Sequence, residues 1–297
     1  MTTVHRFGGN WTEEKLRRLQ KYLSAYMTIF RGNPRASVYT TYYVDAFAGT
    51  GHRVASGETE ETTLALFDDQ DVADIERFFT GSARVALDSK PSFDRYLFIE
   101  QKSEYVSELE KLRLAYPGKA NQIQIIQGDA NNVLHDWCRR MDWQHNRAVV
   151  FLDPYGMAVN WATIEALGQT KAIDFWILLP VGQAINRLLT RHRIPEGAWA
   201  EKLTAFFGTE DWKNEFYQPR LQESLFEVDE EMEKIATFES IGNYFSARLE
   251  TVFAQVASTS LALLNSKNVP IFLLFFAAAN PRGAPTAVKI AEDILGR

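Results

Sequence analysis

The sequence predicts an α/β protein with a mostly parallel sheet. Five short apolar runs are separated by stretches of helical or loop sequence, an alternation typical of parallel sheets with crossover helices. The runs are continuously apolar, as strands that are buried on both faces are. They are Thr41–Phe47, Tyr96–Glu100, Gln122–Gln127, Ala148–Leu152 and Ile173–Leu179.

A helix is expected before the first strand. Asn10 or Thr12 can cap its free amides, and apolar residues follow at helical spacing until Gly32-Asn-Pro34 ends it. Residues 1–34 are therefore expected to form an N-terminal helical extension. Between the second and third strands, Ser103–Tyr116 has apolar residues at helical period, which fits a crossover helix.

Two further strand-like runs lie near the end of the chain. Ser258–Leu264 and Pro270–Ala278 are joined by the short polar turn Asn265–Asn268, which predicts a hairpin and makes the last of seven strands antiparallel. Class I methyltransferases place such a hairpin at this point, whereas dehydrogenase-type Rossmann domains usually do not. We therefore expect a Rossmann-like class I methyltransferase fold in a single domain, 1–297, with residues 183–250 forming a helical cap inserted after strand five.

Composition limits the class of protein. The 297 residues are 46% hydrophobic, enough for a large core, and no apolar run approaches the ~20 residues of a membrane helix. No secretory leader is recognisable, so we expect a cytoplasmic protein. Cys138 is the only cysteine, which excludes disulfides within the chain and zinc sites built from several cysteines. The formal net charge of -6 argues against nonspecific coating of nucleic acid but permits a local basic patch.

The first strand ends in the sequence Asp45-Ala-Phe47-Ala-Gly49-Thr-Gly51. Glycines let the backbone approach a ligand closely, and open α/β sheets bind ligands at the carboxyl ends of their strands. A Gly-x-Gly pair also occurs in ordinary tight turns. Val54 stands where the dinucleotide fingerprint requires a third Gly or Ala, which disfavours pyrophosphate binding. We expect Asp45, Phe47, Gly49 and Gly51 to contact a nucleotide-like cofactor.

The second and third strands also end in acids. Glu100 can accept both hydroxyls of a ribose in charge-assisted hydrogen bonds. Asp129, with Ala130 beside it, can accept from an adenine amino group. Acids at strand ends also cap the helix that follows, and Asp129 fits that role too. Because three strands in succession end in an acid, we favour a cofactor site over capping alone.

The fourth strand ends in Asp153-Pro154-Tyr155-Gly156. An exocyclic amine of a base is a poor nucleophile, since its lone pair is delocalised into the ring. The Asp153 carboxylate and the Pro154 carbonyl can accept the two amine hydrogens and aim the lone pair at a methyl donor, while Tyr155 can stack on an extruded base. The alternative is a type I turn in which Asp153 caps the next helix.

Three arginines follow the fifth strand. Arg187, Arg191 and Arg193 are expected on the crevice side of the sheet, where they are candidates for binding substrate phosphates. The exposed end of an amphipathic helix is an equal alternative, because Leu188 and Leu189 could pack beneath it.

These motifs resemble those of known families. The loop from Asp45 to Gly51 is similar to motif I of S-adenosylmethionine-dependent methyltransferases, which implies S-adenosyl-L-methionine as the cofactor and a loop that curls around its methionine part. The Asp153–Gly156 tetrapeptide resembles the Asp-Pro-Phe-Gly of tRNA guanine-N2 dimethyltransferases more than the Asp-Pro-Pro-Tyr of adenine-N6 enzymes. Over nearly its whole length the chain resembles the three-Cys-motif partner proteins of bacteria, which implies a small cysteine-bearing protein as a partner. This last likeness is carried by Trp11–Leu16, Tyr22-Leu23, Tyr43–Gly51, Phe151–Gly156 and Phe272–Ala277.

We therefore predict an S-adenosylmethionine-dependent methyltransferase that acts on an exocyclic amine, with a base of RNA or DNA as the favoured substrate and no metal. The alternative is a catalytically silent Rossmann-fold binding partner of a small three-Cys-motif protein. An NAD-dependent oxidoreductase is disfavoured by Val54 and by the terminal hairpin.

Overall fold

The computed structural model describes residues 10–48, 81–154, 156–220, 232–265 and 267–296. Its main sheet has the strand order β3-β2-β1-β4-β5-β10, with two short strands on the outer edge of β10. Neighbouring strands from β3 to β5 are parallel, and β10 is antiparallel to β5. The strands are β1 (Thr40–Ala46), β2 (Arg95–Glu100), β3 (Ile123–Gln127), β4 (Asn146–Leu152), β5 (Ile173–Leu179) and β10 (Pro270–Ala278).

The outer edge of β10 confirms the predicted hairpin. Both β9 (Leu261–Leu264) and β8 (Gln255–Val256) pair antiparallel with β10, so the sheet has eight strands rather than the predicted seven. The predicted strand Ser258–Leu264 is shorter in the structure and begins at Leu261, whereas Ser258 donates from its backbone amide and its hydroxyl to Glu292. The strand β8 precedes it and was not predicted. The mostly parallel, Rossmann-like α/β fold and the antiparallel strand β10 are as predicted.

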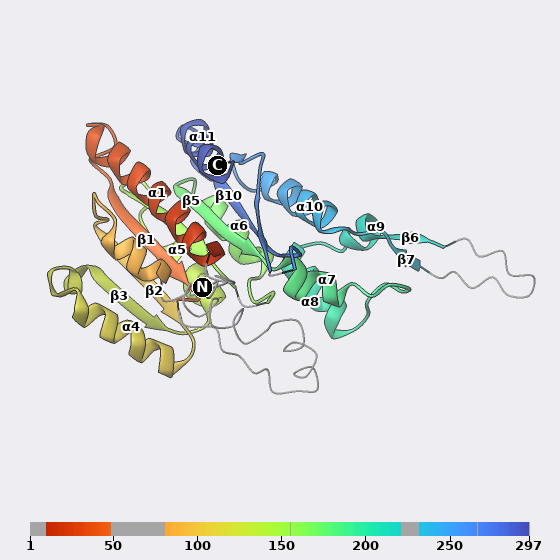
Figure 1. Ribbon diagram of the computed structural model, residues 1–297. Coiled ribbons are helices and arrows are strands. Elements are labelled where there is room, and N and C mark those ends of the chain that lie inside the picture. The colour runs from red at the N-terminus through yellow and green to blue at the C-terminus, as the bar shows by residue number, and fades with distance from the viewer. Residues whose placement is uncertain (1–9, 49–80, 155, 221–231, 266, 297) are drawn as a thin grey trace, which may run out of the picture.

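Helices cover both faces of the sheet (Figure 1). On one face α1, a helix over 81–88, α4 and α11 enclose one buried apolar cluster, and on the other face α5, α6, α8 and α10 enclose a second. Because strand side chains alternate between the two faces, the same strands contribute to both cores. The helices are α1 (Asn10–Gly32), α4 (Ser103–Ala115), α5 (Ala130–Arg140), α6 (Trp161–Gln169), α8 (Ala198–Phe207), α10 (Phe238–Glu250) and α11 (Ala284–Leu295).

The predicted N-terminal helix is α1, and it packs directly on the sheet. Tyr22 and Leu23 are almost completely buried. The Tyr22 hydroxyl donates to Oδ2 of Asp174 on β5 at 2.6 Å, and the Arg18 guanidinium donates to the carbonyl oxygen of Leu295 at the end of α11. These contacts make α1 an integral part of one helical layer.

The segment 183–250, predicted as a helical cap, is not uniformly helical. A turn of π-helix (Val181–Ile185), α7 (Asn186–Leu188), α8 and α9 (Trp212–Phe216) precede α10. An antiparallel pair, β6 (Tyr217–Pro219) with β7 (Met232–Lys234), interrupts the helices and projects from the body of the molecule (Figure 1). The helix α10 packs closely on β10, since a Cβ at Gly242 would lie 2.7 Å from the Leu273 side chain.

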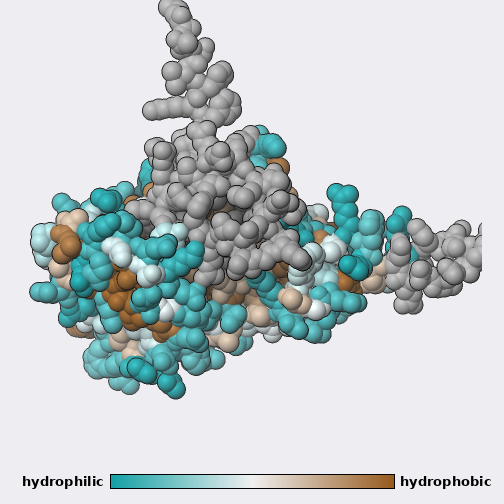
Figure 2. Space-filling view, turned by 90° about the horizontal axis from the view of Figure 1, so that it is seen from below, coloured by the Kyte–Doolittle hydropathy of each residue, from teal (hydrophilic) through white to brown (hydrophobic). Residues whose placement is uncertain are grey.

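None of the helices within the described ranges is both long enough and apolar enough to cross a membrane. Cys138 on α5 lies in a buried apolar cluster, and burial raises the pKa of its thiol to about 12, as expected for a structural cysteine. The described surface in Figure 2 is mainly hydrophilic, with apolar residues in small groups.

Candidate functional site

The register of the parallel strands brings three of the predicted acids to one edge of the sheet. Ala46, at the end of β1, is paired with Ile99 of β2 on one side and with Leu152 of β4 on the other. Glu100 and Asp153 each follow these partners by one residue, so they flank the exit of β1. The order of the strands reverses between β1 and β4, the place where open α/β sheets bind their ligands.

Asp45 is enclosed within the protein at this edge. Its side chain is 1% exposed, and its Oδ2 accepts hydrogen bonds from Ser82 Oγ at 2.7 Å and from the Tyr43 hydroxyl at 3.2 Å. Burial raises the pKa of Asp45 to about 7, with a smaller increase from the Glu100 charge, while the two hydrogen bonds lower it. Burial, the Asp45 carboxyl and, more weakly, Asp153 raise the pKa of Tyr43. Asp45 is therefore close enough to Glu100 to interact with it electrostatically, and Asp153 is close enough to influence Tyr43.

The chain leaves β1 through a strained residue. Phe47 has φ 81°, a left-handed conformation that is uncommon for an aromatic residue and costs roughly 1–2 kcal/mol. The amides of Phe47 and Ala48 both donate to the Ile99 carbonyl at 3.0 Å, which holds the turn over the end of β2. Gly49 and Gly51, which were predicted to continue this loop, lie outside the described residues.

Glu100 is oriented by its own turn. Its Oε1 accepts from the amides of Gln101 and Lys102, each at 2.8 Å, and its carbonyl accepts from the amide of Gly128 beyond β3. The end of β2 is thus linked to the loops that follow both β1 and β3. The half-buried Glu100 side chain lies between them.

Asp129 is the N-cap of α5, the alternative left open by the sequence. Its Oδ1 accepts from the amide of Asn132 at 3.0 Å, the side chain is exposed, and Ala130 is the buried first residue of the helix. Capping occupies one carboxylate oxygen and does not prevent a second contact, because a carboxylate accepts through both oxygens.

The tetrapeptide after β4 is not a helix cap. Asp153 is 2% exposed, Pro154 is buried, and Gly156 has φ 61°, a conformation that favours glycine. Asn160, not Asp153, is the N-cap of α6. The alternative that Asp153 caps the next helix is therefore excluded, while Tyr155 lies outside the described residues.

Asn131 connects these loops and was missed by the sequence analysis. Its Nδ2 donates to the Ala158 carbonyl at 2.8 Å, and its Oδ1 accepts from the Asn160 amide at 2.9 Å and from Thr163 Oγ at 2.8 Å. The side chain thus ties the N-terminus of α5 to the segment between Asp153 and α6. Nothing in the local sequence around Asn131 signals these contacts, which span 27 to 32 residues.

The three predicted phosphate-binding arginines follow β5. Arg187 is half-buried on the short helix α7, and Arg191 and Arg193 are exposed on the loop after it. Between β5 and these arginines, the backbone at Gly182 packs against the start of β10. A Cβ at Gly182 would lie 2.2 Å from the Pro270 carbonyl oxygen, so this position requires glycine.

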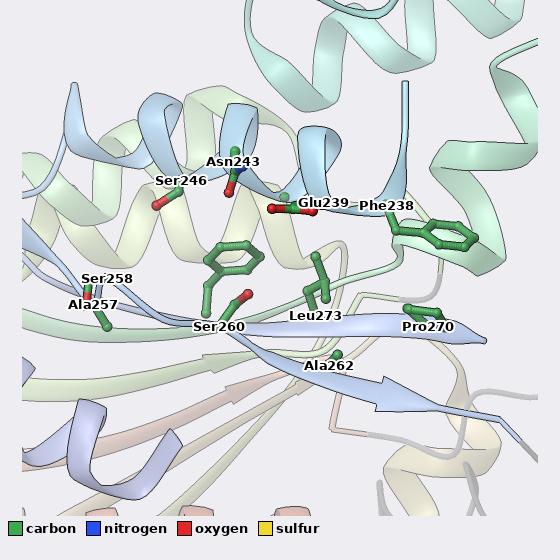
Figure 3. A pocket seen from close by; sticks show the side chains of 12 residues that line it. Phe238, Glu239, Asn243, Ser246, Ala257, Ser258, Ser260, Ala262, Pro270 and Leu273 are labelled. Atoms are coloured by element: carbon green, nitrogen blue, oxygen red, sulfur yellow. The ribbon is translucent and has the colours of Figure 1, made fainter. Parts of the chain in front are cut away.

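One cavity of about 320 Å³ lies away from these strand ends, between α10 and the outer edge of the sheet (Figure 3). Glu239, Asn243 and Ser246 of α10 line one side, and Ser260 and Ala262 line the other. Across the part of the chain that the structure covers, no three His, Cys, Asp or Glu side chains are grouped so that they could hold a metal ion.

No protein-family model and no curated protein sequence matches the chain. Among solved structures, it is similar to a DUF519 protein from Legionella pneumophila, with a TM-score of 0.49 and 14% identity over 97% of this chain and 92% of that one. It is also similar to the O-methyltransferase TomG from Streptomyces achromogenes, solved with S-adenosylmethionine (TM-score 0.38, 12% identity, 87% and 79% of the chains). A third similar structure is the methyltransferase domain of a bacterial Hen1 protein, with a TM-score of 0.33 and 10% identity over 87% of this chain and 98% of that one. These TM-scores are too low to transfer an activity, and the fold assignment depends on the strand order.

Proposed function

We propose that this chain is an S-adenosylmethionine-dependent methyltransferase that acts on an exocyclic amine of a nucleic-acid base. The observation that supports this most is the convergence of Asp45, Glu100 and Asp153 at the ends of three adjacent parallel strands. Of these acids, Glu100 and Asp153 are the ones that could face a ligand, and carboxylates disfavour phosphates and favour a cationic ligand. S-adenosylmethionine carries both a sulfonium and an ammonium group.

Each residue has a role in this proposal. Glu100 accepts the ribose hydroxyls, and Asp129 with the Ala130 amide contacts the adenine. The turn at Phe47, continued by Gly49 and Gly51, encloses the methionine part. The Asp45 carboxyl is already hydrogen-bonded to Ser82 and Tyr43 inside the protein. Its proposed role is therefore to support that turn from below rather than to contact the cofactor directly.

The segment Asp153–Gly156 positions the substrate amine in the same proposal. Bound S-adenosylmethionine supplies an electrophilic methyl group that leaves sulfur without the bonding electron pair. The Asp153 carboxylate and the Pro154 carbonyl accept the amine hydrogens, which directs the nitrogen lone pair to that methyl, and the product nitrogen releases one proton to water. Correct positioning of this kind contributes up to roughly 7–11 kcal/mol in well-aligned reactions. Tyr155 stacks on the base, and the left-handed Gly156 allows the sharp turn.

The resemblance to three-Cys-motif partner proteins adds a small cysteine-bearing protein as a proposed partner. A catalytically silent binding module is the outcome if the cofactor does not bind.

Isothermal titration calorimetry with S-adenosylmethionine tests the proposal. We expect one cofactor per chain, and we expect Glu100→Gln to weaken the affinity about ten- to a hundredfold, since charge-assisted hydrogen bonds contribute about 1.5–3 kcal/mol. Glu104→Gln is the matched control, because Glu104 is an exposed acid in the first turn of α4. Absence of binding by the wild-type protein, alone and with the cysteine-bearing partner, would contradict the proposal.

A further inference from the structure

The chain concentrates positive charge in one short segment. Although the net charge is -6, residues 175–195 contain no acidic residue and carry Arg187, Arg191, His192 and Arg193. The side chains of Arg191, His192 and Arg193 are exposed. Within the described residues, none of the three guanidinium groups forms an ion pair with a carboxylate or donates a hydrogen bond to the protein.

The backbone of this segment is held in place by a neighbouring pair of strands. Tyr217 of β6 donates from its hydroxyl to the Thr190 carbonyl at 2.9 Å, and the Lys234 amide of β7 donates to the Arg191 carbonyl at 3.0 Å. Thr190 Oγ donates to the carbonyl of Arg193. We call residues 187–193 the arginine loop. The carbonyl oxygens of Thr190, Arg191 and Arg193 are therefore fixed, and the exposed side chains of Arg191 and Arg193 extend from a preorganised backbone.

A lysine lies beneath the arginine loop. Lys234 Nζ donates to the Asn186 carbonyl at 3.0 Å, to Asn186 Oδ1 at 2.6 Å and to the Leu189 carbonyl at 3.2 Å, which uses all three of its protons. Burial and the Arg191 charge both lower the pKa of Lys234. The lysine is thus a structural cation, and it adds to the positive potential of the surface above it.

From these contacts we infer that the arginine loop binds the phosphates of a single-stranded nucleic acid. Guanidinium groups that have no carboxylate partner among the described residues are suited to phosphate, and three of them within seven residues suit a ligand whose phosphates repeat. Trp199 on α8, six residues after Arg193, is 42% exposed and offers a surface on which a base can stack. This inference rests on the proposed function and names its substrate class: the target amine is reached only in a base that is unpaired or extruded.

Salt dependence of binding tests the inference. Fluorescence anisotropy with a labelled 20-nucleotide oligo(U) and the corresponding oligo(dT) would be measured between 50 and 300 mM NaCl. For single strands, the slope of log K against log salt is about -0.7 for each phosphate neutralised. We therefore expect the combined change Arg191→Gln and Arg193→Gln to make the slope less negative by about 1.4, and Arg187→Gln by about 0.7.

Control variants distinguish residues that contact phosphate from residues that support the loop. Arg282→Gln with Lys289→Gln removes two exposed charges beyond the far end of β10, at the opposite edge of the sheet, and should leave the slope unchanged. Lys234→Met should lower the affinity because the loop loses its support, while the slope stays near the wild-type value. That split distinguishes a positioning residue from a phosphate contact.

The possible outcomes decide between this inference and its rivals. A slope that is unaffected by the arginine changes, or no binding of either oligonucleotide at 50 mM NaCl, would overturn it. Arginine-dependent binding to phosphatidylserine vesicles but to neither oligonucleotide would assign the loop to a membrane surface instead. Preference for oligo(U) or oligo(dT) would identify RNA or DNA. Calorimetry with S-adenosylmethionine on the same variants should be unchanged, so failure of this inference is distinguishable from failure of the proposed function.

Discussion

The side chain of Asn131 accepts a hydrogen bond from the backbone amide of Asn160 at 2.9 Å. The first residue belongs to α5, which begins after β3, and the second is the N-cap of α6. Because Asn131 also holds the Ala158 carbonyl, it fixes the segment after Asp153 relative to the end of β3. In the proposed enzyme, these two places hold the substrate amine and the adenine of the cofactor.

Asn131→Ala should therefore reduce both stability and transfer. It leaves the Ala158 carbonyl and the Asn160 amide without their partner, so the free energy of unfolding in urea should fall by about 1–3 kcal/mol. Asn132→Ala is the control, because the neighbouring Asn132 is exposed and its side chain makes no hydrogen bond to a described residue. Similar effects of the two changes would show that Asn131 has no special role.

Asp45 should make stability depend on pH near neutrality. Its carboxyl stays protonated in the folded protein up to about pH 7, but only to about pH 4 in the unfolded chain. Between these values the folded state binds more protons, so stability falls as pH rises and levels off above pH 7. Asp45→Asn imitates the protonated form, and its advantage over wild type in urea unfolding should grow by about 3 kcal/mol between pH 5 and pH 8.

Asp174 provides the comparison for that experiment. Burial raises its pKa to about 6, and the hydrogen bond from Tyr22 opposes this increase. The advantage of Asp174→Asn should therefore stop growing near pH 6, whereas that of Asp45→Asn continues to about pH 7. Identical pH profiles for the two variants would contradict the assignment of the higher pKa to Asp45.

Most of the sheet could be predicted because its strands are buried on both faces. The structure has β1 at Thr40–Ala46 where the sequence predicts Thr41–Phe47, and the difference at its end is Phe47, whose left-handed φ no apolar pattern reveals. The pair β6–β7 was not predicted within the segment 183–250. Each of its strands has three residues, too few for an alternating pattern to appear.

The acids of the site could be predicted because the ends of parallel strands meet at one edge. The residues that hydrogen-bond to these acids and to the loops beside them could not be predicted. Ser82 lies 37 residues from Asp45, and Asn131 lies 29 residues from Asn160, so only the folded chain brings them together. Asp129 shows a different limit: its sequence position permits both capping and cofactor binding, the prediction favoured the cofactor, and the structure contains the cap.

Asp153→Asn should separate binding from chemistry. The amide keeps the size of the side chain but removes the negative charge and replaces one acceptor oxygen with a donor, so it accepts the amine hydrogen more weakly. We expect methyl transfer from tritiated S-adenosylmethionine to total cellular RNA or DNA to fall by at least a hundredfold, with cofactor affinity within about threefold of wild type. An equal loss of cofactor affinity would move Asp153 from the substrate side to the cofactor pocket.

Tyr22→Phe should destabilise the contact between α1 and the sheet. The Tyr22 hydroxyl donates to the buried Asp174 carboxyl at 2.6 Å, and its removal should lower the free energy of unfolding by about 1–3 kcal/mol at pH 8. Tyr26→Phe is the matched control: Tyr26 is one turn further along α1 and nearly as buried, but its hydroxyl forms no hydrogen bond with a described residue. The loss in Tyr22→Phe should be smaller at pH 5, because most of Asp174 is then protonated and a neutral acid is less costly to bury without a donor. A loss that is independent of pH, or one that Tyr26→Phe reproduces, would mean that packing of the ring, rather than the hydrogen bond to Asp174, holds α1 on the sheet.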